Sequence, residues 1–377
     1  MFGKLEPGSE DGDHSVACRL DRVRLVKARP PISLGAKVTV VIPNFNYARY
    51  LPDCVNSALA QRGVAVDVLI VDDASTDDSL EVARKLAAAD HRISVLVHER
   101  NSGPVITFND GLAVARGEFL VRLDADDLLT PGSLERSVAV AQHFPSVGLV
   151  YGHPLHFSGA RKQPARVEPT EWTVWPGTEW LTDRCRNGLN VITSPEVLMR
   201  KSVVDMVGGQ QPLAHTHDME MWLRISAFSD VAFIHGVDQA WHREHEKSLS
   251  SHVDPFRDLT ERRDAFRALF SGIAKELPQS EELLRCSLQA IATHALEEAV
   301  RAYSKGAAGH EQFERYKEIA RTAVEDVEAL PEWLALQEWT AVKPWQVAHH
   351  PVFFLQRARR KIRRTIAWRR WHRSGVF

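Results

Sequence analysis

The sequence lacks the features of small disulfide-rich and membrane-spanning proteins. Its 377 residues include only four cysteines, with no CxxC pair and no histidine at zinc spacing. A disulfide framework is therefore not expected, and the cysteines are predicted to be inert thiols in a reducing compartment. No apolar run approaches the roughly 20 residues that a membrane helix needs. The N-terminus also lacks the basic-then-apolar order of a signal peptide.

Low-complexity tracts, repeats and a large net charge are missing too. The composition is 44% apolar and 25% charged with a formal net charge of -2, which is ordinary for a globular protein and argues against a polyanion-binding molecule. Acidic residues are absent after Glu338, whereas nine Arg or Lys lie between Arg357 and Arg373. The chain is long enough for two domains, and this basic tail is a separate feature of it.

The first half of the chain alternates between buried-strand and helix patterns. Residues 1–36 are polar and are expected to form a flexible leader. Continuous apolar, β-branched runs at 38–43, 66–73, 93–99 and 118–124 predict strands buried on both faces. Helix patterns, with proline at a first turn or glycine past an end, lie between them. This β-α-β-α order predicts an α/β fold with a doubly wound, mostly parallel sheet.

The second half changes character. Helices are predicted at 194–209 and 216–228, followed by strand patterns, and from Pro255 onward the chain reads as all-helical. A domain boundary is therefore expected near residue 252. The predicted regions are the leader at 1–36, an α/β domain at 37–252, a helical C-terminal region at 253–340 and a basic amphipathic tail at 341–377.

Three carboxylates fall within four positions at the end of the fourth predicted strand. These are Asp124, Asp126 and Asp127, and a second acidic pair, Asp72–Asp73, ends the second strand. In a parallel α/β sheet, ligands bind beyond the carboxyl ends of the strands. Asp124 and Asp126 are two residues apart, so in an extended segment their side chains point to the same side. Such oxygen ligands suit Mg²⁺ or Mn²⁺ bound to a diphosphate, which would offset their mutual repulsion.

Two other interpretations compete with a metal site. The acids could be turn formers or helix caps, which we favour for Asp127 alone but not for the whole cluster. A receiver-type phosphoacceptor fold also has an acidic pair, but it needs a lone aspartate after the third strand. This chain has "HER" (98–100) there. The whole cluster after a buried strand therefore favours metal and phosphate binding.

Six motifs follow one another in order over about residues 38–250, more than half of the chain. They are "VTVVIPNFNYARYL", "VLIVDDASTDDS", "HERNSGPVITFNDGLAVARGEFLVRLDADD", "SPEVLMRKS", "HDMEMWLR" and "WHREHEKSLS". The series resembles the inverting glycosyltransferases of family 2, which have a GT-A fold. The resemblance implies a GT-A domain at 37–252, a nucleotide-sugar donor linked to UDP, GDP or dTDP, a Mn²⁺ or Mg²⁺ cofactor, and inversion at the anomeric carbon.

The resemblance also assigns residues to nucleotide-sugar binding. They are Pro43, Asn46, Asp72, Asp73, Asn101, Gly103, Asn109, Asp124 and Arg243. Pro43 and Asn46 would frame the nucleoside, and Asp72 or Asp73 would hydrogen-bond the base. Arg243 would pair with the diphosphate as a fork.

Metal binding and catalysis are assigned in the same way. Asp126 would be the main ligand of the metal, with Asp124 and His245 beside it. Asp218, at the start of a predicted helix, would be the general base that takes the proton from the acceptor hydroxyl. An aspartate in a first helical turn also interacts well with the helix dipole, which is the alternative for Asp218 alone.

Two departures from the family pattern raise an alternative function. His217 stands where the family usually has Glu, and Phe108 stands where members often have Arg. A catalytically weak nucleotide-sugar-binding or scaffold protein that keeps the fold is therefore the second hypothesis. The QxxRW element of processive synthases is absent, which favours transfer of one sugar to a hydroxyl of a glycan, a lipid-linked acceptor or a cell-envelope polysaccharide precursor.

The basic tail contains "FFLQRARRKIRRTIAWRRWHR", which could form a helix with an apolar side. Cationic helices that carry Trp commonly lie in a membrane interface, so contact with an anionic membrane surface is one hypothesis. A solvated charged helix, or one packed against the acidic helices between 281 and 328, remains open beside it. Nucleic-acid binding is not expected. The expected location is cytoplasmic, with the inner membrane face as a site of peripheral contact.

Overall fold

Ten strands form one mixed sheet in the computed structural model, which describes residues 19–159, 162–245 and 254–374. The sheet order is β1-β8-β10-β7-β9-β5-β2-β3-β4, and β6 pairs with β10. The strands are β1 (Arg24–Lys27), β2 (Ala36–Asn44), β3 (Val64–Asp72), β4 (Ile93–Val97), β5 (Phe119–Arg122), β6 (Leu128–Leu129), β7 (Val147–Phe157), β8 (Glu171–Trp175), β9 (Leu198–Arg200) and β10 (Asp230–Arg243).

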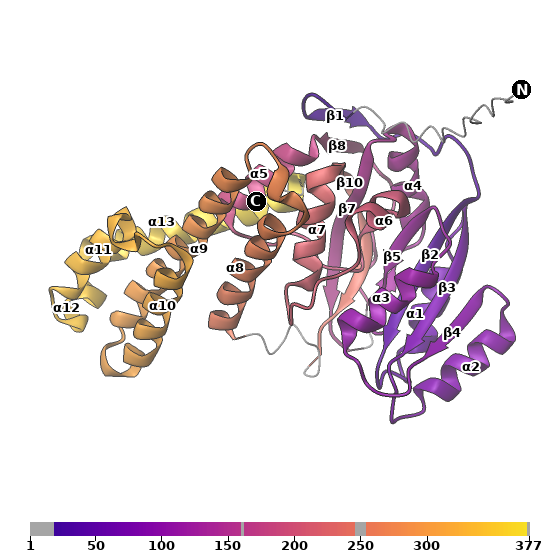
Figure 1. Ribbon diagram of the computed structural model, residues 1–377, viewed down its shortest axis with the longest axis horizontal. Coiled ribbons are helices and arrows are strands. Elements are labelled where there is room, and N and C mark those ends of the chain that lie inside the picture. The colour runs from indigo at the N-terminus through magenta and orange to yellow at the C-terminus, as the bar shows by residue number, and fades with distance from the viewer. Residues whose placement is uncertain (1–18, 160–161, 246–253, 375–377) are drawn as a thin grey trace, which may run out of the picture.

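Helices cover both faces of this sheet and form the whole C-terminal region (Figure 1). Those of the sheet domain are α1 (Leu51–Leu59), α2 (Ser79–Ala89), α3 (Pro104–Val114), α4 (Ser133–His143), α5 (Gly177–Asn187), α6 (Lys201–Val207) and α7 (His217–Phe228). Those of the C-terminal region are α8 (Pro255–Ser271), α9 (Ser280–Tyr303), α10 (His310–Ala323), α11 (Pro331–Thr340), α12 (Pro344–His349) and α13 (Pro351–Ser374). The predicted α/β sheet fold with a helical extension is confirmed.

The parallel half of the sheet brings several strand ends to one edge. β2 pairs in parallel with β3 on one side and with β5 on the other, so the order of the strands reverses at β2. In register, Asn44 lies opposite Asp72, and Val41 lies opposite Arg122. Such a reversal leaves a crevice beyond the carboxyl ends of the strands, and this is where α/β proteins bind ligands.

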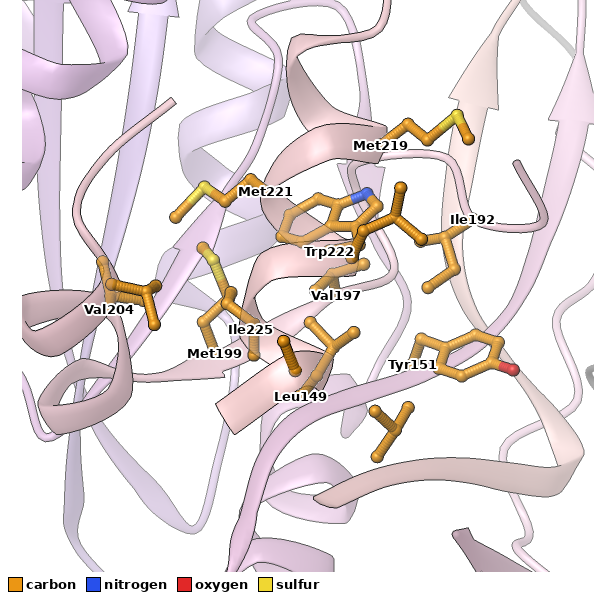
Figure 2. Close-up of a cluster of buried hydrophobic side chains, with 14 of the residues drawn as sticks. Leu149, Tyr151, Ile192, Val197, Met199, Val204, Met219, Met221, Trp222 and Ile225 are labelled. Atoms are coloured by element: carbon orange, nitrogen blue, oxygen red, sulfur yellow. The ribbon is translucent and has the colours of Figure 1, made fainter. Parts of the chain in front are cut away.

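Side chains alternate between two cores, one on each face of the sheet. Val38, Val40 and Ile42 of β2 pack with α1, α2 and α4, whereas Val41 packs with α3 on the other face. Figure 2 shows part of this second core, in which Met199 of β9 and Trp222 of α7 lie close together. Burial on both faces explains why these strands read as continuous apolar runs.

The second core continues into the C-terminal region. Phe266, Leu269 and Phe270 of α8 belong to the same buried cluster as Trp222 of α7. The distal helices α10–α12 form a third cluster with most of α9. Helix α13 returns from α12 to the sheet domain (Figure 1), where Trp371 near its end packs on the second core.

Two expectations about the elements are corrected. Residues 24–27, expected in a flexible leader, form β1, whose backbone pairs with the exposed edge of β8. The segment 194–209, expected to be helical, contains the short strand β9 before α6, because its backbone pairs with β5 and β7. The expected boundary near residue 252 lies outside the described residues.

Three cysteines lie in the described part of the chain, and all three are free thiols. Cys54 and Cys185 are buried free thiols, and Cys286 is a half-buried one. Of the helices described, none combines the length and the apolar character needed to cross a membrane.

Candidate functional site

A cavity of about 1260 Å³ lies beyond the carboxyl ends of β2, β3 and β5. Nine of the twelve predicted site residues line it, although they come from six separate segments. They are Pro43, Asn46, Asp73, Asn101, Gly103, Asp124, Asp126, Asp218 and His245. Asp72, Asn109 and Arg243 are not among the lining residues.

The loop after β2 is held in an unusual conformation by its own asparagine. Asn46 has a φ of 62°, in the left-handed region that asparagine tolerates better than most residues. Its side-chain oxygen accepts hydrogen bonds from the backbone N–H groups of Thr76 and Asp77, at 2.7 and 3.2 Å. The loops after β2 and β3 are thereby joined, and Asn46 shapes this wall of the cavity.

The two acids that end β3 have different roles in the structure. Asp72 is fully buried and accepts hydrogen bonds from Asn44 Nδ2 at 2.8 Å and from the backbone of Ser75 at 3.1 Å. Asp73 lines the cavity and accepts from the N–H groups of Ser102 and Gly103, at 2.8 and 2.9 Å. The geometry therefore favours Asp73 over Asp72 as the group that faces a ligand.

Asp73 remains ionised despite its position. Burial alone would raise its pKa, but the hydrogen bond with His98 and those from the two backbone N–H groups outweigh burial and lower the pKa. Nδ1 of His98 is 2.8 Å from the carboxylate, and Nε2 lies 3.1 Å from Asp110. Asp73 is thus a fixed acceptor that a ligand N–H group could reach.

Asn109 and Arg243 are used inside the protein. The amide of Asn109 exchanges two hydrogen bonds with the backbone of Gln210, at 2.7 and 2.8 Å. The guanidinium of Arg243 lies between the rings of Tyr50 and Phe157, and its Nε donates to the carbonyl of Asp126 at 2.9 Å. These contacts favour a supporting role for both residues instead of direct contact with the donor.

An arginine that the sequence did not single out pairs with the first acid of the cluster. Nε of Arg122 donates to Asp124 at 3.0 Å, and its Nη1 donates to Gln210 Oε1 at 2.8 Å. Burial would raise the pKa of Asp124, but the charge and hydrogen bond of Arg122 lower it overall. The guanidinium also lies over the ring of buried Phe108, 5.4 Å from its centre. Arg122 therefore supplies a positive charge beside Phe108, whose own side chain is uncharged.

The last acid of the cluster is structural. Asp127 is fully buried, accepts from the backbone N–H of Arg243 at 2.8 Å and lies 3.1 Å from Nδ1 of His242. Burial would lower the pKa of His242, but the bond to Asp127 outweighs it and raises the pKa to about 9. This pair joins the turn after β5 to the end of β10, as expected of a turn-forming acid.

Within the residues that the structure describes, Asp126 has no bond to a protonated side chain and its pKa is raised, as burial also raises the pKa of Asp127. Burial, together with the negative charges of Asp127 and Asp124, raises the pKa of Asp126 well above the usual range. His245 Nε2 lies 2.8 Å from its Oδ2, and burial and nearby arginines lower the pKa of His245. A neutral imidazole beside a carboxylate that is destabilised by like charges is a pair that a dication would stabilise.

The donor set fits a divalent ion that a ligand helps to hold. Among the described residues, no three His, Cys, Asp or Glu side chains form a ready metal-binding group. Mn²⁺ and Mg²⁺ are, however, often bound through one or two carboxylates together with substrate phosphates. Asp126, with His245 and Asp124 nearby, meets that lower requirement.

Asp218 also lines the cavity, in the first turn of α7. Its Oδ1 accepts from the backbone N–H of Met219 at 2.6 Å, and Oδ2 lies 3.4 Å from the hydroxyl of Ser194. His217 beside it also lines the cavity and is buried, which together with Arg122 lowers its pKa. A carboxylate with weakly engaged Oδ2 next to a neutral imidazole can accept a proton.

Several lining residues carry no family assignment. Arg122 could have been found, because it alternates with Asp124 along a strand and so faces the same side. Asp258 and Arg262 of α8 also line the cavity, and Arg262 donates to the carbonyl of Gly188 at 2.5 Å. Nothing local in the sequence signals them, since α8 approaches the site only through its packing against α7 and α9.

Comparison with known proteins agrees with this fold. Residues 39–207 match the family model described as Glycosyl transferase family 2. The Nostoc protein alr2836, an uncharacterized glycosyltransferase, is 41% identical over 115 residues, which are 30% of this chain and 36% of that protein. EpsE of Bacillus subtilis is 30% identical over 200 residues, which are 50% of this chain and 66% of EpsE. The chain thus spans under two thirds of the length of either relative.

A solved structure extends the similarity beyond the matched segment. TarS 1-349 of S. aureus, in complex with UDP-GlcNAc, has a TM-score of 0.58 at 18% identity, over 81% of this chain and 87% of that one. At that identity the likeness concerns the fold. With the order of the motifs and a cavity at the strand reversal, residues 39–207 thus form a glycosyl transferase family 2 domain, and the chain has the GT-A fold.

Proposed function

We propose that this protein is a metal-dependent, inverting glycosyltransferase that moves one sugar from a nucleotide-sugar donor to a hydroxyl acceptor. One observation carries the proposal. Two acids from different elements line the same cavity. Asp126 follows β5 and has a raised pKa, which a bound cation would lower, and Asp218 lies in the first turn of α7. A donor diphosphate beside Asp126 and an acceptor hydroxyl beside Asp218 would place the anomeric carbon between them.

The residues of the cavity divide the reaction between them. Asp73 would accept a hydrogen bond from the nucleobase of the donor, and Asp126, Asp124 and His245 would hold Mn²⁺ or Mg²⁺. When bound, that ion supplies positive charge next to the leaving diphosphate. Asp218 takes the proton of the acceptor hydroxyl as its oxygen bonds to the anomeric carbon, and the bond to the diphosphate breaks on the opposite side. Attack from the far side inverts the configuration.

The donor and the acceptor are proposed by class. UDP-, GDP- and dTDP-sugars are the donor candidates, and TarS, which shares the fold, was solved with UDP-GlcNAc. The acceptor proposed is a glycan, a lipid-linked acceptor or a cell-envelope polysaccharide precursor, handled in the cytoplasm. Transfer of a single sugar is proposed because the sequence has no QxxRW element.

The test is an assay of nucleoside diphosphate release across a panel of UDP-, GDP- and dTDP-sugars, with Mn²⁺, with Mg²⁺ and with a chelator. We expect release with one class of donor, and its loss in the chelator. The anomeric configuration of the product, measured by NMR, tests inversion. Retention of configuration would refute the mechanism even if transfer occurs.

The same assay separates the alternative of a binding or scaffold protein. His217 and Phe108 favour that alternative, whereas the Arg122 guanidinium over Phe108 provides a cation at the cavity wall. Thermal stabilisation by a donor without any release, with or without acceptor, would support the alternative. Release at a rate above the spontaneous hydrolysis of the donor would exclude it.

A further inference from the structure

Helix α13 is held against the protein along one side and leaves the opposite side open. Near its start, Phe353 is buried in the distal cluster with Trp333 and Leu336. Near its end, Trp371 packs on the sheet-domain core, and its Nε1 donates to the carbonyl of Val191 at 2.8 Å. The two residues are 18 positions apart, about five full turns, so they mark the same side of the helix.

Three aliphatic side chains lie on the side that faces away from these anchors. Leu355, Ile362 and Ile366 follow Phe353 by 2, 9 and 13 residues, which places them about 180–220° around the helix at roughly 100° per residue. Their exposed fractions are 55%, 58% and 60%. Phe354 and Trp345 add large exposed side chains at the start of this stretch. Three exposed aliphatic side chains that share the outward side of one helix are uncommon on a monomer and mark an interaction surface.

Basic side chains flank this row. Arg359 and Arg363 lie on one side of it, Lys361 lies on the other, and all three are exposed. No acidic residue follows Glu338, so the helix has no carboxylate of its own to balance them.

We infer that the outward side of α13 is a docking surface for an anionic lipid bilayer. The row Leu355–Ile362–Ile366 would enter the interface between head groups and acyl chains. The arginine and lysine stems can lie along the same apolar layer while their charges reach the lipid phosphates. Because the exposed side chains beside the row are basic, an anionic bilayer fits this surface better than a neutral bilayer or an apolar groove of another protein. This surface is separate from the catalytic residues, so it stands whether or not the proposed transfer reaction is correct.

The experiment is vesicle flotation of the full chain without substrate. Two lipid compositions are compared: pure phosphatidylcholine, and phosphatidylcholine with phosphatidylglycerol in equal parts. We expect flotation with the anionic vesicles only, decreasing with added salt. The double variant Ile362→Glu/Ile366→Glu should lower the vesicle-bound to free ratio by about tenfold or more, because two carboxylates would have to enter the interface.

A second variant tests the charge separately. Arg359→Gln/Arg363→Gln should also lower the ratio, by roughly 25- to 30-fold, since each basic residue near an anionic surface contributes about fivefold. The matched controls are Met206→Glu, an exposed apolar position on α6, and Arg62→Gln/Arg84→Gln in the sheet domain. Both controls should float like the wild type. Circular dichroism checks that each variant is folded.

Three results would overturn the inference. If the wild type floats equally well with neutral and anionic vesicles, or with neither, an anionic membrane is not the partner of this surface. A dimer in light scattering that Ile362→Glu/Ile366→Glu dissociates, without flotation, means that a second copy covers the row. Retention of labelled single-stranded RNA that Arg359→Gln/Arg363→Gln abolishes, again without flotation, makes nucleic acid the partner.

Discussion

Asp126 and Asp127 are neighbours in the chain, yet their carboxylates have opposite surroundings. Asp127 is bonded to a protonated His242 and accepts from a backbone N–H, and these partners offset in part the burial that raises its pKa. Asp126 faces a neutral His245 and the charges of other acids. The sequence predicts an acidic cluster, but it does not show which acid lies beside which histidine. The two histidines come from the end of β10 and the residues just after it, more than a hundred residues later.

That difference predicts opposite effects of two similar substitutions. Asp127→Asn should lower the free energy of unfolding by about 3 kcal/mol, because it leaves a buried cation without its partner. Asp126→Asn should leave stability unchanged or raise it, because one of several like charges is removed. Urea unfolding at pH 7 in a chelator measures both. Equal losses in the two variants would contradict the division.

Asp218→Asn should reduce turnover by about a hundredfold to ten-thousandfold, the usual contribution of a general base. The dissociation constant of the donor should change less than twofold, because the base acts on the acceptor. Steady-state kinetics and calorimetric titration measure the two effects. Asp53→Asn, at an exposed aspartate of α1, is the control, and near wild-type turnover of Asp218→Asn would refute the assignment.

Asp238 predicts how stability depends on pH. Burial opposes its ionisation, but hydrogen bonds from His153 and Arg166 outweigh burial and hold its pKa well below the usual range. A lowered pKa in the folded state adds stability above the unfolded value of about 4, and this is lost as the pH falls. Asp238→Asn should therefore cost about 2 kcal/mol at pH 7. Unfolding curves should show this difference shrinking below pH ~4, and a constant difference would contradict it.

At the scale of the element, the long buried strands were predictable and the short paired ones were not. β2 and β3 carry enough consecutive apolar residues to show burial on both faces. β9 has three residues and β1 has four, and both exist because neighbouring strands supply their hydrogen bonds. Strands that depend on tertiary pairing leave little pattern in their own sequence.

The contact between α5 and α7 gives a prediction at this scale. A Cβ on Gly177 would lie 2.1 Å from the carbonyl oxygen of Ser226 and closer still to that of Ser229. Gly177→Ala should therefore separate the two helices and cost about 1–3 kcal/mol. Thermal unfolding measures the loss, with the exposed neighbour Thr178→Ala as control. An unchanged melting temperature for Gly177→Ala would show that α5 can shift without cost.

At the scale of the molecule, the helical extension is divided between two cores. Phe266 of α8 lies in the core of the sheet domain, whereas Phe313 of α10 lies in the distal cluster. The sequence indicated a helical region but gave no sign of this division, because both halves have similar amphipathic patterns. The wall that α8 adds to the cavity was missed for the same reason.

Two substitutions of the same type should therefore act at different places. Each of Phe266→Ala and Phe313→Ala removes a buried ring, which costs about 3–5 kcal/mol. Hydrogen exchange should increase in α5 and α7 for Phe266→Ala, and in α9 and α11 for Phe313→Ala. Mass spectrometry of the exchanged peptides measures this. Faster exchange in α7 for Phe313→Ala would mean that the two cores open together.

The participation of α8 in the cavity wall bears on how this protein could be re-engineered. A chimera that imports only residues 39–207 from a relative would receive the strand ends of one protein and keep Asp218, His245 and Arg262 of another. The residues that line its cavity would then come partly from one parent protein and partly from the other. An exchange of donor specificity would have to continue through α8 for both halves to be inherited together.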